Sequence, residues 1–315
     1  MAKKNLFFYS TGENLKYPIV VISGVCRSGK TLLGNLIATC PEAEYADEPW
    51  TGMALTIAAH SGKIEKEFVL SMLSAYFFEL FNDLVLLRNA NFRRKDHSSI
   101  WTKKTPEEID MRLNNINTRS DVINFSKSNR STLVVTLAEC SPFVNIISAA
   151  TNQAQMIHVV RDGFEVAWDV SEKNWFSDDQ LLNPINAQLY SSLDMEGRTW
   201  YIPWWVDECD EEFFLKLSNF ERSLYYWCSL MTKGLEAIQS SKTKEILVRH
   251  EDLVRNPEHE FNRVISYLDF SQGKLSAQMI ERIKPIETKR TLPKIDSNIL
   301  DKANKLNQKI RAMHG

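Results

Sequence analysis

A strand, a glycine-bearing loop and a helix follow one another near the start of this chain, and this order constrains its fold more than any other feature. Residues 17–23 form a continuous β-branched apolar run, which is typical of a strand buried on both faces of a parallel sheet. The loop Gly24-Val-Cys-Arg-Ser-Gly-Lys-Thr31 follows at once, and residues 31–39 then place leucine and isoleucine at helical spacing. The order predicts an α/β protein with this loop at the carboxyl edge of its sheet.

Three further apolar runs predict strands, each followed by a plausible helix. They cover residues 132–137, 156–160 and 245–249. Such alternation predicts a P-loop-type three-layer fold, in which a mainly parallel sheet is flanked by helices and ligands bind at the carboxyl ends of the strands. No repeat or linker marks a boundary, so residues 1–315 are expected to form a single domain. Residues 173–219 break the pattern with aromatic side chains among polar residues and prolines, and are expected to form an irregular insertion or lid.

The composition excludes several classes of protein. With 43% hydrophobic and 25% charged residues, the chain has enough apolar side chains for a full core and lacks the bias of a disordered protein. Its 38 Lys and Arg face 40 Asp and Glu, so the net charge of -2 lacks the basic excess that general polyanion binders usually show. The five cysteines are scattered without metal-ligand spacing, which favours a reducing compartment and no structural metal.

Neither an export signal nor a membrane span is expected. Residues 1–10 contain two lysines but no apolar stretch of signal-peptide length, so a cytoplasmic location is expected. Residues 68–87 are long enough to cross a membrane, but Glu79, Asn82 and Asp83 interrupt them. We expect a buried helix there and no transmembrane segment.

The loop satisfies the pattern GxxxxGK[ST] between a predicted strand and a predicted helix, which is the context that this pattern requires. Its glycines let backbone N–H groups point into one concavity, and Lys30 and Arg27 would neutralise anionic oxygens. The simpler interpretation is a tight turn with a solvated lysine and arginine. The pattern and its context favour a phosphate site.

The loop pattern alone does not identify the donor nucleotide. A magnesium-dependent triphosphatase would have a second strand that ends in Asp, whereas the strand at 156–160 ends in Arg161 and Asp162. The arginine indicates a second anion, such as another phosphate of the nucleotide. Asp162 keeps the magnesium alternative open.

Three motifs in order resemble those of the sulfotransferases that use 3′-phosphoadenosine 5′-phosphosulfate (PAPS). Residues 27–36, continuing to Glu48-Pro-Trp50, are similar to the 5′-phosphosulfate loop and the Glu-Pro of carbohydrate-type and bacterial members. Residues 155–167 are similar to the 3′-phosphate element, and residues 247–257 to a late strand and helix. The resemblance spans most of the chain and implies the P-loop-type fold, PAPS as the donor and no required metal.

The resemblance assigns roles residue by residue. The implied donor-binding residues are Arg27, Ser28, Gly29, Lys30, Thr31, Arg161 and His250. Lys30 stands where the family usually has Thr or Ser, so the loop also fits a nucleotide kinase. His250 matches a family tyrosine, although a lone histidine on a strand is more often a packed side chain.

The 3′-phosphate element departs from the family pattern at its serine. The position eight residues after Arg161 holds Asp169, whose charge would repel a phosphate, and Ser171 follows two positions later. We expect Ser171 to substitute through a shifted turn. Lys289-Arg290 matches a late basic cluster that reaches the 3′-phosphate in some relatives.

The catalytic assignment rests on the same resemblance. Glu48 matches the Glu-Pro glutamate, and residues 44–48 can return as a parallel strand that places it beside the loop as general base. Without the resemblance, Glu48 would be one more surface carboxylate. Lys30 and Arg27 would stabilise the charge that develops on the sulfonate and the leaving phosphate.

The leading hypothesis is a sulfotransferase that moves the sulfuryl group from PAPS to a hydroxyl or amine of a carbohydrate or small metabolite. An ATP- and magnesium-dependent kinase is the first alternative, because of Lys30, Thr31 and Asp169. A nucleotide-binding protein without turnover is the second. No nucleic-acid partner is expected, and the acceptor pocket would involve residues 173–219.

Overall fold

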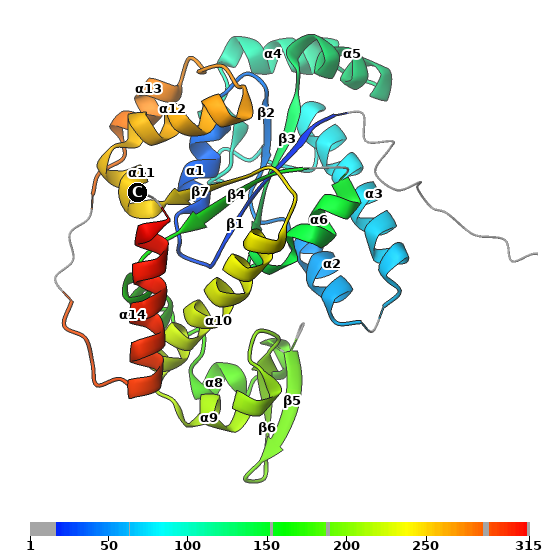
Figure 1. The fold of residues 1–315 in the computed structure, drawn as a ribbon. Helices are drawn as coiled ribbons and strands as arrows, with labels where there is room; N and C mark the ends of the chain where they lie inside the picture. Colours follow the sequence, from blue (N-terminus) through cyan, green and yellow to red (C-terminus); the bar gives the residue numbers. More distant parts are fainter. Residues whose placement is uncertain (1–16, 63, 152–153, 187–189, 286–289, 314–315) are drawn as a thin grey trace, which may run out of the picture.

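Five parallel strands form the central sheet in the computed structural model of this protein (Figure 1). The structure describes residues 17–62, 64–151, 154–186, 190–285 and 290–313, so the stretch searched for an export signal lies outside them. The strands are β1 (Ile19–Gly24), β2 (Ala43–Ala46), β3 (Thr132–Ala138), β4 (Gln155–Val160) and β7 (Glu245–Arg249). Their spatial order is β2-β3-β1-β4-β7, and each neighbouring pair is parallel. The mainly parallel sheet is therefore confirmed.

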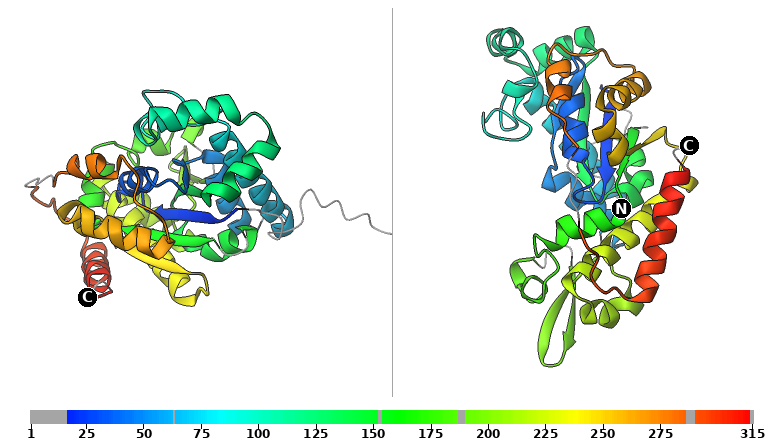
Figure 2. Two further views of the ribbon diagram at one scale, coloured as in Figure 1. Left: turned by 90° about the horizontal axis from the view of Figure 1, so that it is seen from above. Right: turned by 90° about the vertical axis from the view of Figure 1, so that its left-hand side faces the viewer.

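Helices connect the strands and cover both faces of the sheet (Figures 1 and 2). The α-helices of the described residues are α1 (Lys30–Ile37), α2 (Trp50–His60), α3 (Lys66–Val85), α4 (Pro106–Asn115), α5 (Arg119–Asn129), α6 (Val144–Thr151), α7 (Gly163–Ser171), α8 (Asp178–Leu181), α9 (Glu211–Lys216), α10 (Asn219–Ser240), α11 (His250–Arg255), α12 (Pro257–Leu268), α13 (Ser276–Glu281) and α14 (Ser297–Ala312). Short 3-10 turns lie at η1 (Ile100–Thr102), η2 (Ser141–Phe143), η3 (Pro184–Asn186) and η4 (Glu208–Asp210).

The alternation of side chains along β1 explains the three layers. Val20 and Ile22 pack with Leu33 of α1 and with α12 on one face. Val21 packs with Phe77 of α3 and with α6 on the other face. Because both faces are covered, every residue of β1 is buried, as its continuous apolar sequence predicted.

The segment 173–219 is more regular than we expected. It contains α8, α9 and an antiparallel hairpin of β5 (Tyr190–Met195) and β6 (Arg198–Pro203). The hairpin turns at Glu196 and Gly197 with φ values of 53° and 74°, a pair of positive angles typical of a type I′ turn. Glutamate seldom adopts this conformation, so the sequence carried no clear turn signal.

The aromatic side chains of this segment form mostly local core. Trp205 is buried and its ring lies edge-on to Phe176, Phe214 and Tyr226. Together with side chains of α7, α10 and α14 they make a third apolar cluster. The cluster fixes α7 and α10 next to the loop that follows β1.

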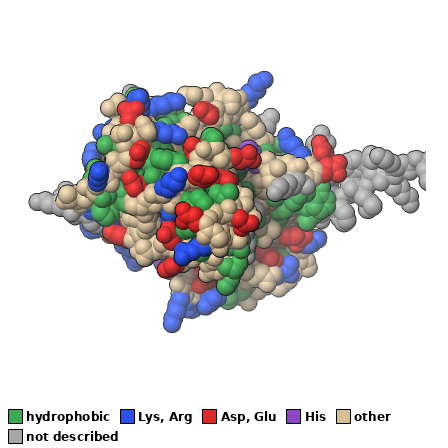
Figure 3. All heavy atoms as spheres, turned by 90° about the horizontal axis from the view of Figure 1, so that it is seen from below, with side chains coloured by type: hydrophobic (Ala, Val, Ile, Leu, Met, Phe, Trp, Pro, Cys, Tyr) green, Lys and Arg blue, Asp and Glu red, His purple; other side chains and the backbone are tan. Residues whose placement is uncertain are grey.

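The face seen from below Figure 1 carries interspersed acidic, basic and apolar side chains (Figure 3). No continuous basic surface is visible on this face, in keeping with the balanced composition.

Helix α3 is long and apolar enough to cross a membrane by length and composition. One side of it packs into the core, where Leu73, Phe77 and Phe81 are almost fully buried. Phe68, near its start, is 48% exposed. The expected buried helix is therefore confirmed for one side of α3.

A buried ion pair fixes α4 against the edge strand β2. Arg112 Nη1 lies 2.8 Å from Glu44 Oε2, and both side chains are almost inaccessible to solvent. Arg112 Nη2 donates to Glu108 at 2.7 Å. This network holds β2 in place, and β2 leads directly to Glu48.

Removal of the Arg112 guanidinium should strongly destabilise the protein. Arg112→Ala leaves the Glu44 carboxylate buried without its partner, a change that typically costs about 3–5 kcal/mol of unfolding free energy. Urea denaturation measures the loss. Arg119→Ala is the matched control, because the Arg119–Glu79 pair is about half exposed and its loss should cost less than about 1 kcal/mol. Equal losses in the two variants would contradict this account of β2.

Candidate functional site

The loop between β1 and α1 has the backbone of an anion-binding turn. Gly24 has a φ of 151° and Gly29 a φ of 97°, values that L side chains rarely adopt. A Cβ on Gly24 would collide with the Val159 carbonyl oxygen, so this position requires glycine. Gly29 caps α1 without a side-chain hydrogen bond. The first N–H groups of α1 therefore remain available, at the positive end of the helix dipole.

Two buried polar atoms beside this loop have no hydrogen-bond partner among the described residues. They are the hydroxyl oxygen of Ser28, a residue with 0% exposure, and Nδ1 of His250. His250 begins α11, and its ring lies so close to Gly29 that a Cβ there would collide with Nδ1. Buried polar atoms are nearly always paired, so two unpaired ones beside the same turn indicate a ligand. An anionic oxygen would accept hydrogen bonds from both.

Burial, together with the neighbouring charge of Arg161 and against the opposing effect of Asp169, lowers the pKa of His250 to about 4. The ring is therefore neutral at pH 7. Because a neutral imidazole carries one N–H, its Nδ1 tautomer can donate to an anion without adding charge.

The low pKa of His250 predicts a pH-dependent stability. In the unfolded chain a histidine takes up its proton near pH 6.5, whereas the folded protein resists protonation down to about pH 4. When the pH falls from 7 to 4, the unfolding free energy of the wild type should therefore decrease by up to about 3 kcal/mol more than that of His250→Asn. Urea denaturation across this range measures the difference. Parallel pH profiles of the two proteins would contradict it.

Lys30 lies beneath the loop and contacts Glu48. Its Nζ donates to the Val25 carbonyl oxygen at 2.7 Å and lies 3.6 Å from Glu48 Oε1. The lysine side chain is 3% exposed, whereas that of Glu48 is 42% exposed. Strand β2 is parallel to β3 and returns the chain to the loop, as the sequence predicted. Glu48 can therefore meet both the loop lysine and a molecule from solvent.

Thr31, at the start of α1, faces a second carboxylate. Its hydroxyl donates to Asp47 Oδ1 at 3.4 Å, and the Tyr45 hydroxyl donates to the same oxygen at 2.7 Å. Among the described residues, no group of three or more His, Cys, Asp or Glu side chains is placed to hold a metal ion. Thr31 and Asp47 are the pair that a magnesium ion at this loop would use.

Three arginines meet around Asp169. The Arg161 guanidinium donates to Asp169 at 2.6 Å and that of Arg290 donates at 3.0 Å, while Arg27 Nε lies 3.9 Å away. Arg161 also donates to the Arg27 carbonyl oxygen at 2.9 Å, which joins this arginine cluster to the loop. Lys289 lies outside the described residues. The late basic residue Arg290 therefore reaches the same place as Arg161, 129 positions earlier in the sequence.

The structure does not form the shifted turn that was expected to bring in Ser171. Helix α7 runs unbroken to this residue, because Asp162 caps it by accepting from the N–H groups of its first turn. The Ser171 hydroxyl donates to the Trp168 carbonyl oxygen of its own helix. Asp169, and not Ser171, is the residue that this helix presents to Arg161.

Glu139 is a site residue that the sequence reasoning did not select. It follows β3, whose last residue Ala138 pairs with Gly24, so its carboxylate lies beside the loop. The Cys26 thiol contacts it at 3.7 Å, and the side chains of Tyr226 and Trp204 donate hydrogen bonds to it. Burial raises the pKa of Glu139, and these donors together with the nearby Lys30 limit the rise. Its position directly after a predicted strand could have marked it as a candidate site residue. Only the pairing of β3 with β1 shows that it lies beside the loop.

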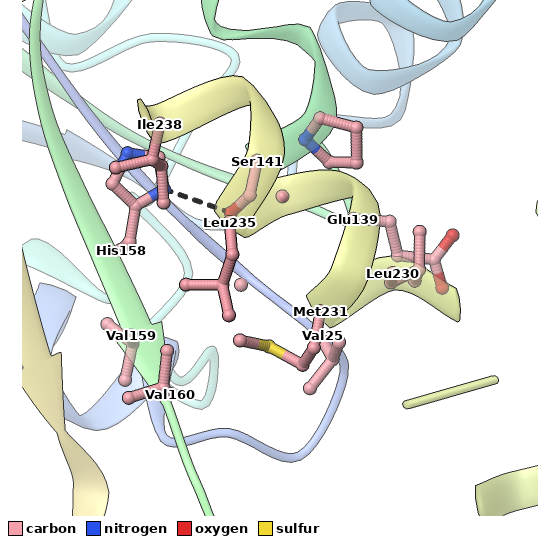
Figure 4. Close-up of a pocket in the computed structure, with 13 residues that line it drawn as sticks. Val25, Glu139, Ser141, His158, Val159, Val160, Leu230, Met231, Leu235 and Ile238 are labelled. Carbon is pink, nitrogen blue, oxygen red and sulfur yellow. Dashed lines mark hydrogen bonds between the residues drawn. The ribbon is translucent and has the colours of Figure 1, made fainter. Parts of the chain in front are cut away.

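An apolar cavity next to Glu139 is too small to bind a substrate. It encloses about 10 Å³, which is room for about one water molecule. Figure 4 shows His158 on one side of this cavity, bonded to Ser141, with the carboxylate of Glu139 directed away on the other side. His158 also bonds to Glu245 of β7 at 3.0 Å. This buried chain of polar contacts joins neighbouring strands, and the phosphate loop remains the candidate site.

No protein-family model matches this chain, and no curated protein matches it either. Solved structures do resemble it. The sulfotransferase domain from the curacin biosynthetic pathway is 13% identical, with a TM-score of 0.45 over 84% of this chain and 77% of that chain. The sulfotransferase domain of the Synechococcus PCC 7002 olefin synthase is 12% identical, with a TM-score of 0.46 over 94% and 97%.

A sulfotransferase from Alicyclobacillus acidocaldarius is 11% identical, with a TM-score of 0.38 over 94% of this chain and 93% of that chain. The fold of this chain is established by its own sheet order, and any reaction has to be argued from its own residues. These similar structures are all sulfotransferases, the family that the motifs of this chain resemble.

Proposed function

We propose that this protein is a sulfotransferase that moves the sulfuryl group from PAPS to a hydroxyl or amine of a carbohydrate or small metabolite. One observation carries the proposal: the three motifs that resemble this family in sequence lie together in space. Gly29 of the first motif lies against His250 of the third, and Arg27 contacts Arg161 of the second. We take residues 1–315 as one domain, with residues 173–219 beside its acceptor side.

The residues present fit a nucleotide with an anionic 5′ end. The hydroxyl of Ser28 and Nδ1 of His250, which have no partner among the residues that the structure describes, would donate to its oxygens, together with the first N–H groups of α1. Lys30 and Arg27 supply positive charge at the same turn. When PAPS is bound there, it supplies an activated sulfuryl group.

Glu48 is placed to act as the general base. Its carboxylate is accessible from solvent and lies next to Lys30, so an acceptor that enters from solvent can reach both. Glu48 would take the acceptor proton while the acceptor oxygen or nitrogen bonds to sulfur and the sulfur–oxygen bond to the nucleotide breaks. Lys30, Arg27 and the loop N–H groups would stabilise the negative charge on the departing phosphate.

Glu139 and the hairpin extend the site on the acceptor side. Trp204, just after β6, donates to Glu139, and the nearby Glu139 carboxylate adds to the rise that burial causes in the pKa of Tyr190. These contacts bring residues of the 173–219 segment to the loop. We therefore propose that the hairpin forms part of the acceptor pocket, with polar and aromatic side chains suited to a hydroxylated molecule.

A kinase is the second candidate function, and the contact between Thr31 and Asp47 favours it. A threonine hydroxyl and a carboxylate are the protein ligands that hold magnesium in phosphate-loop enzymes. The hydroxyl of Thr31 lies 3.4 Å from the Asp47 carboxylate, and Lys30 completes the kinase form of the loop. ATP with magnesium is therefore the competing ligand in the test.

Calorimetry with adenosine 3′,5′-bisphosphate, and separately with ATP plus magnesium, distinguishes these functions. The sulfotransferase proposal predicts tighter binding of the bisphosphate, unchanged by a metal chelator. Metal-dependent, tighter binding of ATP would establish the kinase instead. Binding of the bisphosphate without sulfate transfer to any of a broad set of acceptors would favour a protein without turnover.

Ser28→Ala tests the loop in the same assay. The variant removes one donor to the nucleotide phosphate, so bisphosphate binding should weaken by about tenfold or more. Ser240→Ala, at the exposed end of α10, is the matched control and should bind like the wild type. Unchanged binding by Ser28→Ala would exclude its hydroxyl as a contact.

A further inference from the structure

The geometry points to the Asp169 carboxylate as a permanent ligand of Arg161 and Arg290, the two arginines that would bind a second phosphate group. This protein therefore binds nucleotides with and without a second phosphate group almost equally well. The inference rests on the proposed function, because it concerns the nucleotide at the same loop. It goes further in naming the residue that determines which donors are accepted.

The Asp169 carboxylate already takes the place that an anion would take. Its two oxygens accept from different arginines, Oδ2 from Arg161 at 2.6 Å and Oδ1 from Arg290 at 3.0 Å. Arg27 belongs to the loop, and its Nε lies 3.9 Å from the same Oδ2 atom. A carboxylate bound between guanidinium groups satisfies the same donors that would hold a phosphate.

Among the described residues, the arginine cluster carries no net charge. Besides Asp169, Arg290 contacts Glu165 at 3.2 Å and Glu172 at 3.4 Å, and Arg161 lies 3.6 Å from Glu165. Three guanidinium groups therefore face three carboxylates. An additional anion would enter a site without surplus positive charge, and would lie next to a fixed negative one.

The backbone holds Asp169 in this position. Asp162 caps α7, and the helix continues without a break, so Glu165 and Asp169 lie one turn apart on the same side. Asp169 has a side-chain exposure of 14% and Arg161 one of 15%. Although burial raises the pKa of Asp169, the hydrogen bonds and charges of Arg161 and Arg290 lower it below its usual value. The carboxylate is therefore ionised at neutral pH.

The phosphate loop takes no part in the competition between Asp169 and a second phosphate group for the arginines. Ser28 and His250 have polar atoms without a partner in the described part of the chain, whereas Arg161 and Arg290 are already bonded. A nucleotide that carries only a 5′ anionic group can use the loop fully. A second phosphate gains contacts with the arginines only if it displaces Asp169. This exchange adds little to the binding free energy of the nucleotide.

The direct test compares adenosine 5′-monophosphate with adenosine 3′,5′-bisphosphate by calorimetry on the full chain. In the wild type, the two dissociation constants should agree within about threefold. Asp169→Asn removes the charge but keeps the shape, and should tighten binding of the bisphosphate by about tenfold or more, as expected for one freed charge-assisted contact. Binding of the monophosphate should change by less than about threefold. Asp169→Ser is a second variant in case the asparagine lowers stability.

Glu79→Gln is the matched control. It removes a half-exposed carboxylate that pairs with Arg119 of α5 and is not one of the three carboxylates around the arginines. The control should leave the ratio of the two dissociation constants unchanged. A wild type that binds the bisphosphate more than about tenfold tighter would overturn the inference and leave the proposed function standing. An unchanged ratio in both Asp169 variants would also overturn it, whereas failure to bind either nucleotide would overturn the inference and the proposed function together.

Discussion

Lys30→Ala should reduce the transfer of labelled sulfate from PAPS by about 10²- to 10³-fold, the usual effect of removing one preorganised donor to developing charge. Lys30 is almost fully buried beneath the loop, and its ammonium group lies 3.6 Å from the Glu48 carboxylate. No water molecule that replaces it could carry the same charge at this place. The rate is measured with the best of a panel of hydroxyl and amine acceptors.

The structure predicts that Lys30→Ala still folds. Its partner Glu48 is 42% exposed, so the carboxylate left behind remains hydrated and costs little stability. Lys216→Ala, an exposed lysine of α9, is the control and should retain the wild-type rate. A folded Lys30→Ala protein with near-normal turnover would remove Lys30 from the catalytic machinery.

Glu48→Gln should lower the transfer rate by about 10²- to 10⁴-fold, because the amide does not accept the acceptor proton. Binding of adenosine 3′,5′-bisphosphate should be nearly unchanged, since the phosphate loop and His250 are untouched. The two measurements together separate the base from the donor site. Calorimetry and the sulfate-transfer assay use the same preparation of protein.

Glu212→Gln is the control for this substitution. The Glu212 side chain is 74% exposed and pairs with the exposed Lys216. Near-normal transfer in Glu48→Gln would exclude it as base and direct attention to Glu139, the other carboxylate beside Lys30. Loss of nucleotide binding in Glu48→Gln would show that the glutamate supports the loop rather than the proton transfer.

Local sequence predicted the parts of the fold that depend on local geometry. The apolar run before Gly24 and the glycines of the loop determine a buried strand and a tight turn without reference to the rest of the chain. Residues 44–48 return beside the loop because a short strand after α1 pairs in parallel with β3. The contact between Lys30 and Glu48 follows from these two facts.

Long-range pairing limited the prediction of the site. Glu139 gains its position only because Ala138 of β3 pairs with Gly24 of β1, and the sequence does not show which strands are neighbours. Arg290 reaches Asp169 across a similarly long separation. Such residues can be assigned to a site only after the sheet order is known.

Helix capping explains the failure at Ser171. The prediction required a shifted turn, but the Asp162 carboxylate accepts from the N–H groups of Phe164 and Glu165 and starts a regular helix. The regular helix directs Asp169 to Arg161. A carboxylate expected to repel the ligand is thus, in the structure, the partner of the arginines.

A crystal structure of the protein with adenosine 3′,5′-bisphosphate tests the central claim most directly, namely that the three motifs form one nucleotide site. The account predicts the 5′-phosphate on the loop, within hydrogen-bond distance of the first N–H groups of α1, Ser28 Oγ and His250 Nδ1. A nucleotide bound elsewhere, or a loop that stays without nucleotide when bisphosphate binding is saturated, would contradict it.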